Sequence, residues 1–142
     1  MKMLITAITL ALASQAQAEG QTHHVAIHVD QNDPQVMNMA LNNAQNMDSF
    51  YADQGDSVVI EVVTYGPGLM MLVKGQSPVE QRISAMSLEM ENLSFSACQN
   101  TLNGMQKSAG HDIPLVSEAA MTPSGVVRLV ALQEQGYAYI RP

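Results

Sequence analysis

The chain has 142 residues, of which 46% are hydrophobic and 13% charged. This length fits one domain, since domains usually span about 100–200 residues. The apolar content excludes a disordered acidic chain, which could not bury enough surface to offset its ordering entropy. Six Lys and Arg against 13 Asp and Glu give a net charge of −7, so the chain lacks the basic footprint with which nucleic-acid binders displace counterions. A single cysteine excludes a disulfide framework and a four-cysteine zinc site.

The first 18 residues have the pattern of a secretory signal peptide. Lys2 forms a short positive start, residues 3–13 are an apolar run, and residues 16–18 (Ala-Gln-Ala) are a small-x-small cleavage pattern. The apolar run is shorter than the roughly 20 residues that span a bilayer, and no later segment comes near that length. We therefore predict a cleaved signal peptide at 1–18, a domain at 19–142, no membrane partner, and a periplasmic or secreted location.

Predicted strands and helices alternate along the rest of the chain. Short β-branched runs that are apolar on both faces are typical of strands covered on both sides of a parallel sheet. The helical stretches repeat apolar residues every three to four positions and begin at Asp-Pro, Ser-Pro or Thr-Pro pairs. In chain order we expect a strand at His24–Asp30, a helix from Pro34 to about Asp53, a strand at Ser57–Tyr65, a helix from Ser77-Pro78 to about Leu93, a strand at Leu93–Ala97, a helix from Gln99 to about Ser108, a brief strand at Ile113–Val116, a helix from Thr122-Pro123 to about Gln135 and a strand at Tyr137–Ile140.

The alternation predicts an α/β fold, a single-domain layered sandwich with a mostly parallel sheet of about five strands. In such sheets ligands bind outside the carboxyl ends of the strands. Three of these ends carry a carboxylate, a glycine loop and the only thiol of the chain. We therefore predict Cys98 as the reactive residue and expect a binding site around it, formed by Asp30, Tyr65, Gly66, Gly68, Asn100 and Thr101.

Cys98 lies at the predicted junction between a strand and a helix. A helix N-terminus carries unsatisfied N–H groups and a partial positive charge, which favour a thiolate and lower the pKa of a cysteine. Asn100 and Thr101 can add donors to whatever the sulfur carries. Thiols of exported proteins normally pair, and Cys98 has no internal partner. We expect a functional thiol that reagents can reach; the other reading is a small apolar residue packed at a strand end.

Four segments resemble one known family. Ala40–Asn46, Val63–Leu69, Phe95–Thr101 and Gly136–Pro142 occur in this order and match the exported branch of the DsrE/DsrF-like family over essentially the whole mature chain. The resemblance implies a compact α/β sandwich that assembles into trimers or hexamers. It also implies a sulfur relay, in which a cysteine accepts a sulfane sulfur as a persulfide and hands it on. The residue at that position is Cys98, in Phe-Ser-Ala-Cys-Gln-Asn-Thr.

Other features of the sequence favour packing over chemistry. Many methionines survive signal cleavage, but several fall on predicted core stripes, and Met37 and Met39 point apart on one helix. His28 and Asp30 could approach one ion, yet a third ligand is missing, which favours a core histidine whose hydrogen bonds are satisfied. No phosphate-binding loop or dinucleotide fingerprint is present. The apolar segment Leu69–Val73 is either buried or covers a subunit contact, of which we favour the contact. We predict no metal and no cofactor.

The sequence thus indicates a periplasmic sulfur-handling protein, a possible sulfurtransferase or sulfur carrier, in which Cys98 forms a persulfide. Its partners would be copies of itself, as a homotrimer or homohexamer, and a sulfur donor or acceptor that is either a protein or a small sulfur compound. Two alternatives remain open. One is a non-catalytic oligomeric module that binds a small ligand or a partner, with Cys98 structural. The other is a soft-metal carrier that uses Cys98 with Met70 or Met71.

Overall fold

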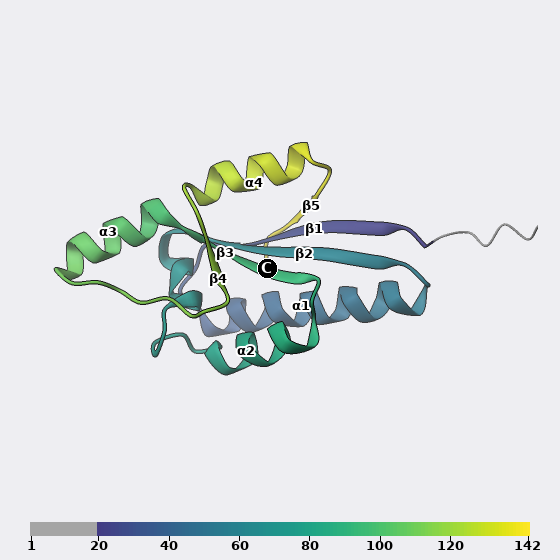
Figure 1. Ribbon diagram of the computed structural model, residues 1–142, viewed down its shortest axis with the longest axis horizontal. Coiled ribbons are helices and arrows are strands. Elements are labelled where there is room, and N and C mark those ends of the chain that lie inside the picture. Colours follow the sequence, from purple (N-terminus) through teal and green to yellow (C-terminus); the bar gives the residue numbers. More distant parts are fainter. Residues whose placement is uncertain (1–19) are drawn as a thin grey trace, which may run out of the picture.

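A computed structural model describes residues 20–142 of the chain, so the predicted signal peptide and Glu19 lie outside the described residues. It confirms the predicted fold class: helices flank a five-stranded parallel sheet with the strand order β4-β3-β2-β1-β5 (Figure 1). The elements are β1 (Thr22–Val29), α1 (Pro34–Asp53), β2 (Ser57–Thr64), the 3₁₀ helix η1 (Gly66–Leu72), α2 (Glu80–Glu89), β3 (Leu93–Cys98), α3 (Gln99–Ala109), β4 (Ala119–Thr122), α4 (Gly125–Glu134) and β5 (Ala138–Ile140).

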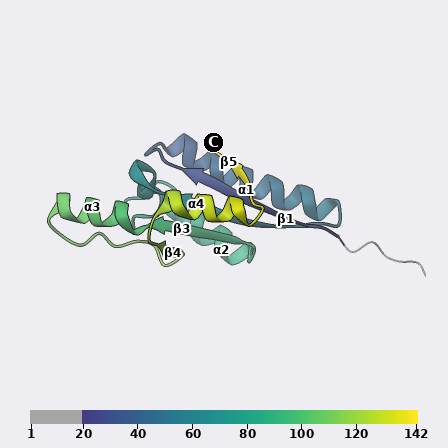
Figure 2. The same cartoon turned by 90° about the horizontal axis from the view of Figure 1, so that it is seen from above.

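The two faces of the sheet are covered unequally. Residues such as Ile27, Val62 and Phe95 pack against α1, α2 and η1 in a large apolar core. The opposite face carries a much smaller cluster, in which Ala26 and Val63 meet two leucines of α4. Figure 1 shows α4 on one side of the sheet and α1 and α2 on the other, and Figure 2 shows α4 lying over the strands. Most of the apolar burial that stabilises the fold therefore lies on the α1–α2 side.

The predicted helix boundaries hold where a local cap fixes them. Asp33 is extended, and its side chain accepts a hydrogen bond from the backbone N–H of Gln35, while Pro34 takes the first helical position of α1. At the other end of a helix, Gly110 has φ 75°, the left-handed conformation that ends α3 after Ala109. Both ends lie within a residue of the prediction, because the signal is local.

The predicted strand at Ile113–Val116 is wrong. In this segment Leu115 makes only an isolated antiparallel bridge to Val73, and the fourth strand is β4, a few residues later. Pro114 has no N–H to donate to a ladder, and its carbonyl instead accepts from Lys74. The pairing of Cys98 with Thr122 keeps the chain in β4 at the point where the sequence suggested a helix cap, so α4 begins only at Gly125.

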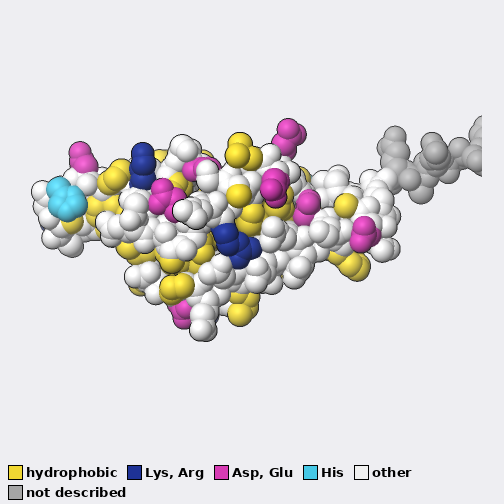
Figure 3. Space-filling model, turned by 90° about the horizontal axis from the view of Figure 1, so that it is seen from below, with side chains coloured by type: hydrophobic (Ala, Val, Ile, Leu, Met, Phe, Trp, Pro, Cys, Tyr) yellow, Lys and Arg dark blue, Asp and Glu magenta, His cyan; other side chains and the backbone are white. Residues whose placement is uncertain are grey.

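The apolar segment that follows β2 is buried within its own chain. Leu69, Met71, Leu72 and Val73 are fully buried, which favours the burial alternative over the expected subunit contact. None of the helices between residues 20 and 142 is both long and apolar enough to cross a bilayer. Seen from the α1–α2 side, the described surface shows scattered acidic groups and few Lys and Arg side chains (Figure 3).

Candidate functional site

Cys98 is the last residue of β3 and the residue from which α3 starts. Its neighbour across the sheet is Thr122, the last residue of β4. The thiol is free, and the residue is only 4% exposed. It lines neither of the two cavities described below. The structure therefore places Cys98 at the strand–helix junction that the sequence predicted, but the single chain covers it more than we expected.

Hydrogen-bond donors surround the Cys98 sulfur. Burial by itself would raise the pKa of this thiol, but hydrogen bonding from the Thr101 side chain and from the backbone N–H groups of Gly125, Thr101 and Asn100 outweighs it, and the pKa is lowered. The first-turn N–H groups of α3 face the sulfur, although none of them makes a close capping hydrogen bond to it. The environment thus favours the thiolate, which is the nucleophilic form of cysteine.

Two helices begin beside this sulfur. The N–H of Asn100, in the first turn of α3, is shared between the Cys98 sulfur and the carbonyl of Pro123, which lies 3.3 Å away and just before α4. Gly125, the first residue of α4, lies against the Tyr65 side chain, where a Cβ would come within 2.8 Å of the Tyr65 ring. Only glycine fits between Tyr65 and this turn. The starts of α3 and α4 therefore meet at the carboxyl end of β3, and both direct N–H groups towards the site.

The glycine loop after β2 supports the site from the other side. The N–H of Gly66 donates to Oγ1 of Thr101 at 2.9 Å, so the loop fixes the same hydroxyl that approaches Cys98. Gly68 packs against the end of β1, and a Cβ there would lie 2.1 Å from the carbonyl oxygen of Val29. Gly66 is thus joined to the site through Thr101, whereas Gly68 serves the close packing of η1 on β1.

A groove of about 770 Å³ runs between η1 and α3, where α3 extends beyond the sheet (Figure 1). Gly66, Asn100 and Thr101 lie along it, together with Met70 and Met105. It therefore brings three of the predicted binding residues to one surface. Met71, by contrast, is fully buried in the large core, which removes it from the soft-metal reading. Among the described residues, no group of three His, Cys, Asp or Glu side chains is arranged to hold a metal ion.

Asp30 and Tyr65 belong to a polar and aromatic cluster that extends from Cys98 towards β5. Arg141 forms an ion pair with Asp30 at 3.0 Å, and the Tyr65 ring stacks on His28 with centroids 4.6 Å apart. Nδ1 of His28 lies 2.7 Å from the Tyr139 hydroxyl. Burial, the Asp30 carboxylate and Tyr139 raise the pKa of Tyr65. Its hydroxyl therefore stays protonated and can donate a hydrogen bond.

His28 is the buried titratable group of this cluster. It is 4% exposed, and its Nε2 atom has no hydrogen-bond partner. Burial lowers its pKa; Asp30 opposes this effect, and Arg141 adds to it. The sequence predicts a core histidine whose hydrogen bonds are satisfied, and this holds for Nδ1, which contacts the Tyr139 hydroxyl, but not for Nε2. An unpaired buried nitrogen carries a desolvation cost.

Several residues of the site were not predicted from the sequence. Gly125 of α4, Tyr139 of β5 and Arg141, which follows β5, reach it only through the tertiary fold. The pair formed by Glu61 and Arg128 also lies on this face of the sheet. The sequence carried a signal for that pair, because a carboxylate inside a buried strand requires a charged partner.

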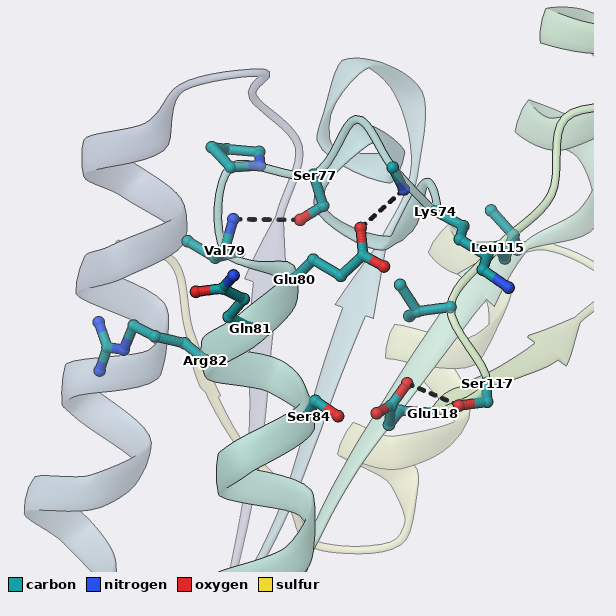
Figure 4. A pocket seen from close by; sticks show the side chains of 13 residues that line it. Lys74, Ser77, Val79, Glu80, Gln81, Arg82, Ser84, Leu115, Ser117 and Glu118 are labelled. Carbon is teal, nitrogen blue, oxygen red and sulfur yellow. Dashed lines mark hydrogen bonds between the residues drawn. The ribbon is translucent and has the colours of Figure 1, made fainter.

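A second cavity, of about 800 Å³, lies apart from the predicted residues, between the start of α2 and the segment before β4 (Figure 4). Lys74, Glu80 and Glu118 line it, and Arg82 turns away from it towards α1. The Glu80 side chain accepts from the N–H of Gly75 at 2.7 Å. Ser117 donates to Glu118. Two of its carboxylates are thus engaged by neighbouring groups, and none of the predicted site residues lines this cavity.

No protein-family model matches the chain, and no curated protein matches it. The chain is similar to a solved structure, the protein of unknown function MTH1491 from Methanobacterium thermoautotrophicum, with 31% sequence identity and a TM-score of 0.69. The match covers 84% of this chain and 99% of that protein. The similarity thus extends over the whole of the archaeal protein and includes its fold.

Proposed function

Because the chain belongs to the same family as MTH1491, whose function is unknown, we propose its function from its own geometry: a periplasmic sulfur-handling protein in which Cys98 accepts a sulfane sulfur as a persulfide and passes it on. The observation that carries the proposal is the position of the only thiol between the starts of α3 and α4, among donors that lower its pKa. The resemblance of four segments to the DsrE/DsrF-like family supports the same chemistry.

The reaction needs one nucleophile and no redox cofactor. The Cys98 thiolate attacks the sulfane sulfur of a donor such as thiosulfate or a persulfide. The donor S–S bond breaks, a Cys98 S–S bond forms, and sulfite or a thiolate leaves with the electron pair. An acceptor thiolate then attacks the outer sulfur and regenerates the Cys98 thiolate. One S–S bond is exchanged for another at each step, so a lone cysteine suffices for a sulfurtransferase or carrier.

The predicted binding residues have distinct roles in this scheme. The Thr101 hydroxyl and the first-turn N–H groups of α3 stabilise the anionic sulfur. Gly66 holds that hydroxyl in place, and Tyr65 can donate a hydrogen bond to the incoming donor. Asp30 is neutralised by Arg141, which reduces the repulsion of an anionic donor at the mouth of the site.

The proposal includes a homotrimer or homohexamer as its assembled form. The outer side of α4 exposes Val126, Val127 and Val130, at 53%, 63% and 50% respectively. Three neighbouring valines on one helix face form an apolar patch of the kind that subunit contacts cover. The sulfur donor or acceptor, a protein or a small sulfur compound, would then approach the carboxyl ends of the strands. The predicted signal peptide supports the periplasmic location.

The test is the intact mass of the protein (residues 19–142) after exposure to polysulfide or thiosulfate. We expect the wild-type chain to gain one sulfur atom and to lose it on addition of a small thiol. Cys98→Ser should gain none. A matched variant, Thr101→Val, keeps the thiol but removes the hydroxyl, and should take up sulfur more slowly. Identical spectra for wild type and Cys98→Ser would refute the proposal.

One observation favours a second candidate function. At 4% exposure, Cys98 is as well covered as a structural cysteine, which suits a non-catalytic oligomeric module that binds a small ligand or a partner. The groove between η1 and α3 would then be the binding surface. In that case Cys98→Ser would leave ligand binding and assembly unchanged, and the folded wild-type protein would not react with thiol reagents.

A further inference from the structure

An ion pair joins α4 to the centre of the sheet. Glu61 lies in β2, and Arg128 lies in the first turns of α4. The guanidinium contacts both carboxylate oxygens, with Nε 2.7 Å from Oε1 and Nη2 2.6 Å from Oε2. Ser96 of β3 donates to the same carboxylate at 2.5 Å. The contact is therefore a two-point fork with a third hydrogen bond from the neighbouring strand.

Stability alone does not require this pair. Glu61 is 6% exposed, and a buried ion pair loses in desolvation much of what it gains in attraction, so an apolar pair of similar volume is often as stable. What the fork adds is geometry. A planar guanidinium held at two points fixes both the height and the rotation of the helix that carries it, which a leucine could not do as sharply.

Helix α4, which this pair orients, begins beside Cys98. The N–H of Arg128 donates to the carbonyl of Ser124 at 2.9 Å, within one turn of Gly125. Thr122 pairs with Cys98 in the sheet, and only two residues separate Thr122 from Gly125, the first residue of α4. A small change in the tilt or rotation of α4 thus displaces the Gly125 N–H from the sulfur.

The remaining attachment of α4 is slight. Its buried apolar contacts are few: Leu129 and Leu132 pack on Ala26 and Val63, with the Tyr65 and Tyr137 side chains beside them. Apolar contacts are non-directional, so they do not by themselves fix the rotation of the helix. The two-point contact between Glu61 and Arg128 is therefore the directional contact that can fix the position and rotation of the first turn of α4.

We propose that Glu61 and Arg128 are a positioning pair, which holds the first turn of α4 over Cys98 and thereby sets the reactivity of its thiol. The inference rests on the proposed function of Cys98 and adds two residues that touch neither the sulfur nor the donor. It assigns a role to the charged residue inside strand β2 and to the arginine within the apolar stretch 125–132 of α4.

The experiment measures the rate at which iodoacetamide alkylates Cys98 across pH, together with thermal unfolding, in the protein of residues 19–142. Arg128→Met removes the fork, and Arg128→Lys keeps the charge without the two-point geometry. The double variant Glu61→Gln with Arg128→Met leaves no unpaired buried charge, so it remains informative if the single variant does not fold. The matched control is Arg82→Met, because Arg82 ties α2 to Asn38, Asn42 and Gln45 of α1 on the opposite side of the sheet.

We expect the pH midpoint of Cys98 alkylation to rise in Arg128→Met and in the double variant. At pH values below the midpoint, a rise of one pH unit leaves tenfold less thiolate. We therefore expect the alkylation rate there to be about three to ten times lower than in wild type. Arg128→Lys should fall between these variants and wild type. Arg82→Met should lower thermal stability without moving the midpoint. The proposal is overturned if the folded Arg128 variants keep the wild-type profile, or if every variant of the pair simply unfolds, which would make the pair structural.

These measurements, together with sulfur uptake followed by intact mass in the same variants, separate this inference from the proposed function. A thiol that is alkylated in the folded wild type but never takes up sulfur refutes the proposed function and leaves the positioning role intact. A wild-type thiol that reacts only when the protein unfolds refutes both. A thiol that takes up sulfur at the same rate with and without the Glu61–Arg128 fork refutes the positioning role alone.

Discussion

The contact between Gly125 and Tyr65 gives the sharpest test of the site, through the substitution Gly125→Ala. The new Cβ would lie 2.8 Å from Cδ1 and 2.9 Å from Cβ of Tyr65, where ordinary contacts begin at 3.4 Å. The Tyr65 Cβ is fixed to the backbone at the end of β2, so the first turn of α4 must shift instead. Overpacking of this kind destabilises the folded state by about 1–3 kcal/mol. Replacing glycine with alanine also lowers the conformational entropy of the unfolded chain, which offsets about 0.4–1 kcal/mol of that cost.

We therefore expect Gly125→Ala to lower the free energy of unfolding by about 1–2 kcal/mol in urea titrations. It should also raise the pH midpoint of Cys98 alkylation, because the shifted turn withdraws an N–H from the sulfur. The matched control is Gly104→Ala in α3, where a Cβ meets nothing within 4 Å and should stabilise the helix by about 0.5–1 kcal/mol. If Gly125→Ala is as stable as wild type and its Cys98 titrates unchanged, α4 does not begin against Tyr65.

Three further predictions follow from the same contacts. Gly68→Ala, whose Cβ would lie 2.1 Å from a backbone oxygen, should cost more than Gly125→Ala, about 3 kcal/mol or more in urea unfolding; a smaller cost would show that η1 is not packed on β1 as described. The folded state disfavours the His28 imidazolium, so stability should fall as pH drops below the ordinary pKa of 6.5 towards the lowered folded value. His28→Phe should flatten that part of the stability profile; an unchanged slope in this variant would assign it to another group. Light scattering should give three or six times the mass of one chain for wild type and a smaller mass for Val127→Glu, whereas a monomeric wild type would contradict the proposed assembly.

Most of the fold could be predicted because its signals are local. The apolar run of β2 and the Asp33-Pro34 cap of α1 depend on residues a few positions apart. Strand β4 was missed because Ala-Ala-Met-Thr has no β-branched run and becomes a strand only by pairing with β3. Its register with Cys98 also explains why α4 starts later than its Thr-Pro pair suggested.

Half of the candidate site was predictable for the same reason. Cys98, Asn100 and Thr101 follow one strand, and the rule that parallel strands end at one edge brings them near Gly66. Gly125 and Arg128 lie on a helix whose docking depends on contacts far apart in the sequence. The pairing of Glu61 with Arg128 left a readable trace, since both residues interrupt apolar segments.

The unequal covering of the sheet bears on whether a reagent can reach the buried Cys98 thiol, as the proposed function requires. His28, Glu61, Ser96 and Cys98 lie on one side of the sheet, and burying such groups there gives up apolar packing that the opposite side keeps. The two helices that begin beside Cys98 have few buried residues of their own. These are Leu102 in α3 and Gly125, Leu129 and Leu132 in α4. Elements with few apolar contacts open at a small fraction of the free energy of global unfolding. The cover over Cys98 is thus built from weakly anchored parts of the fold, while the α1–α2 side carries the stability.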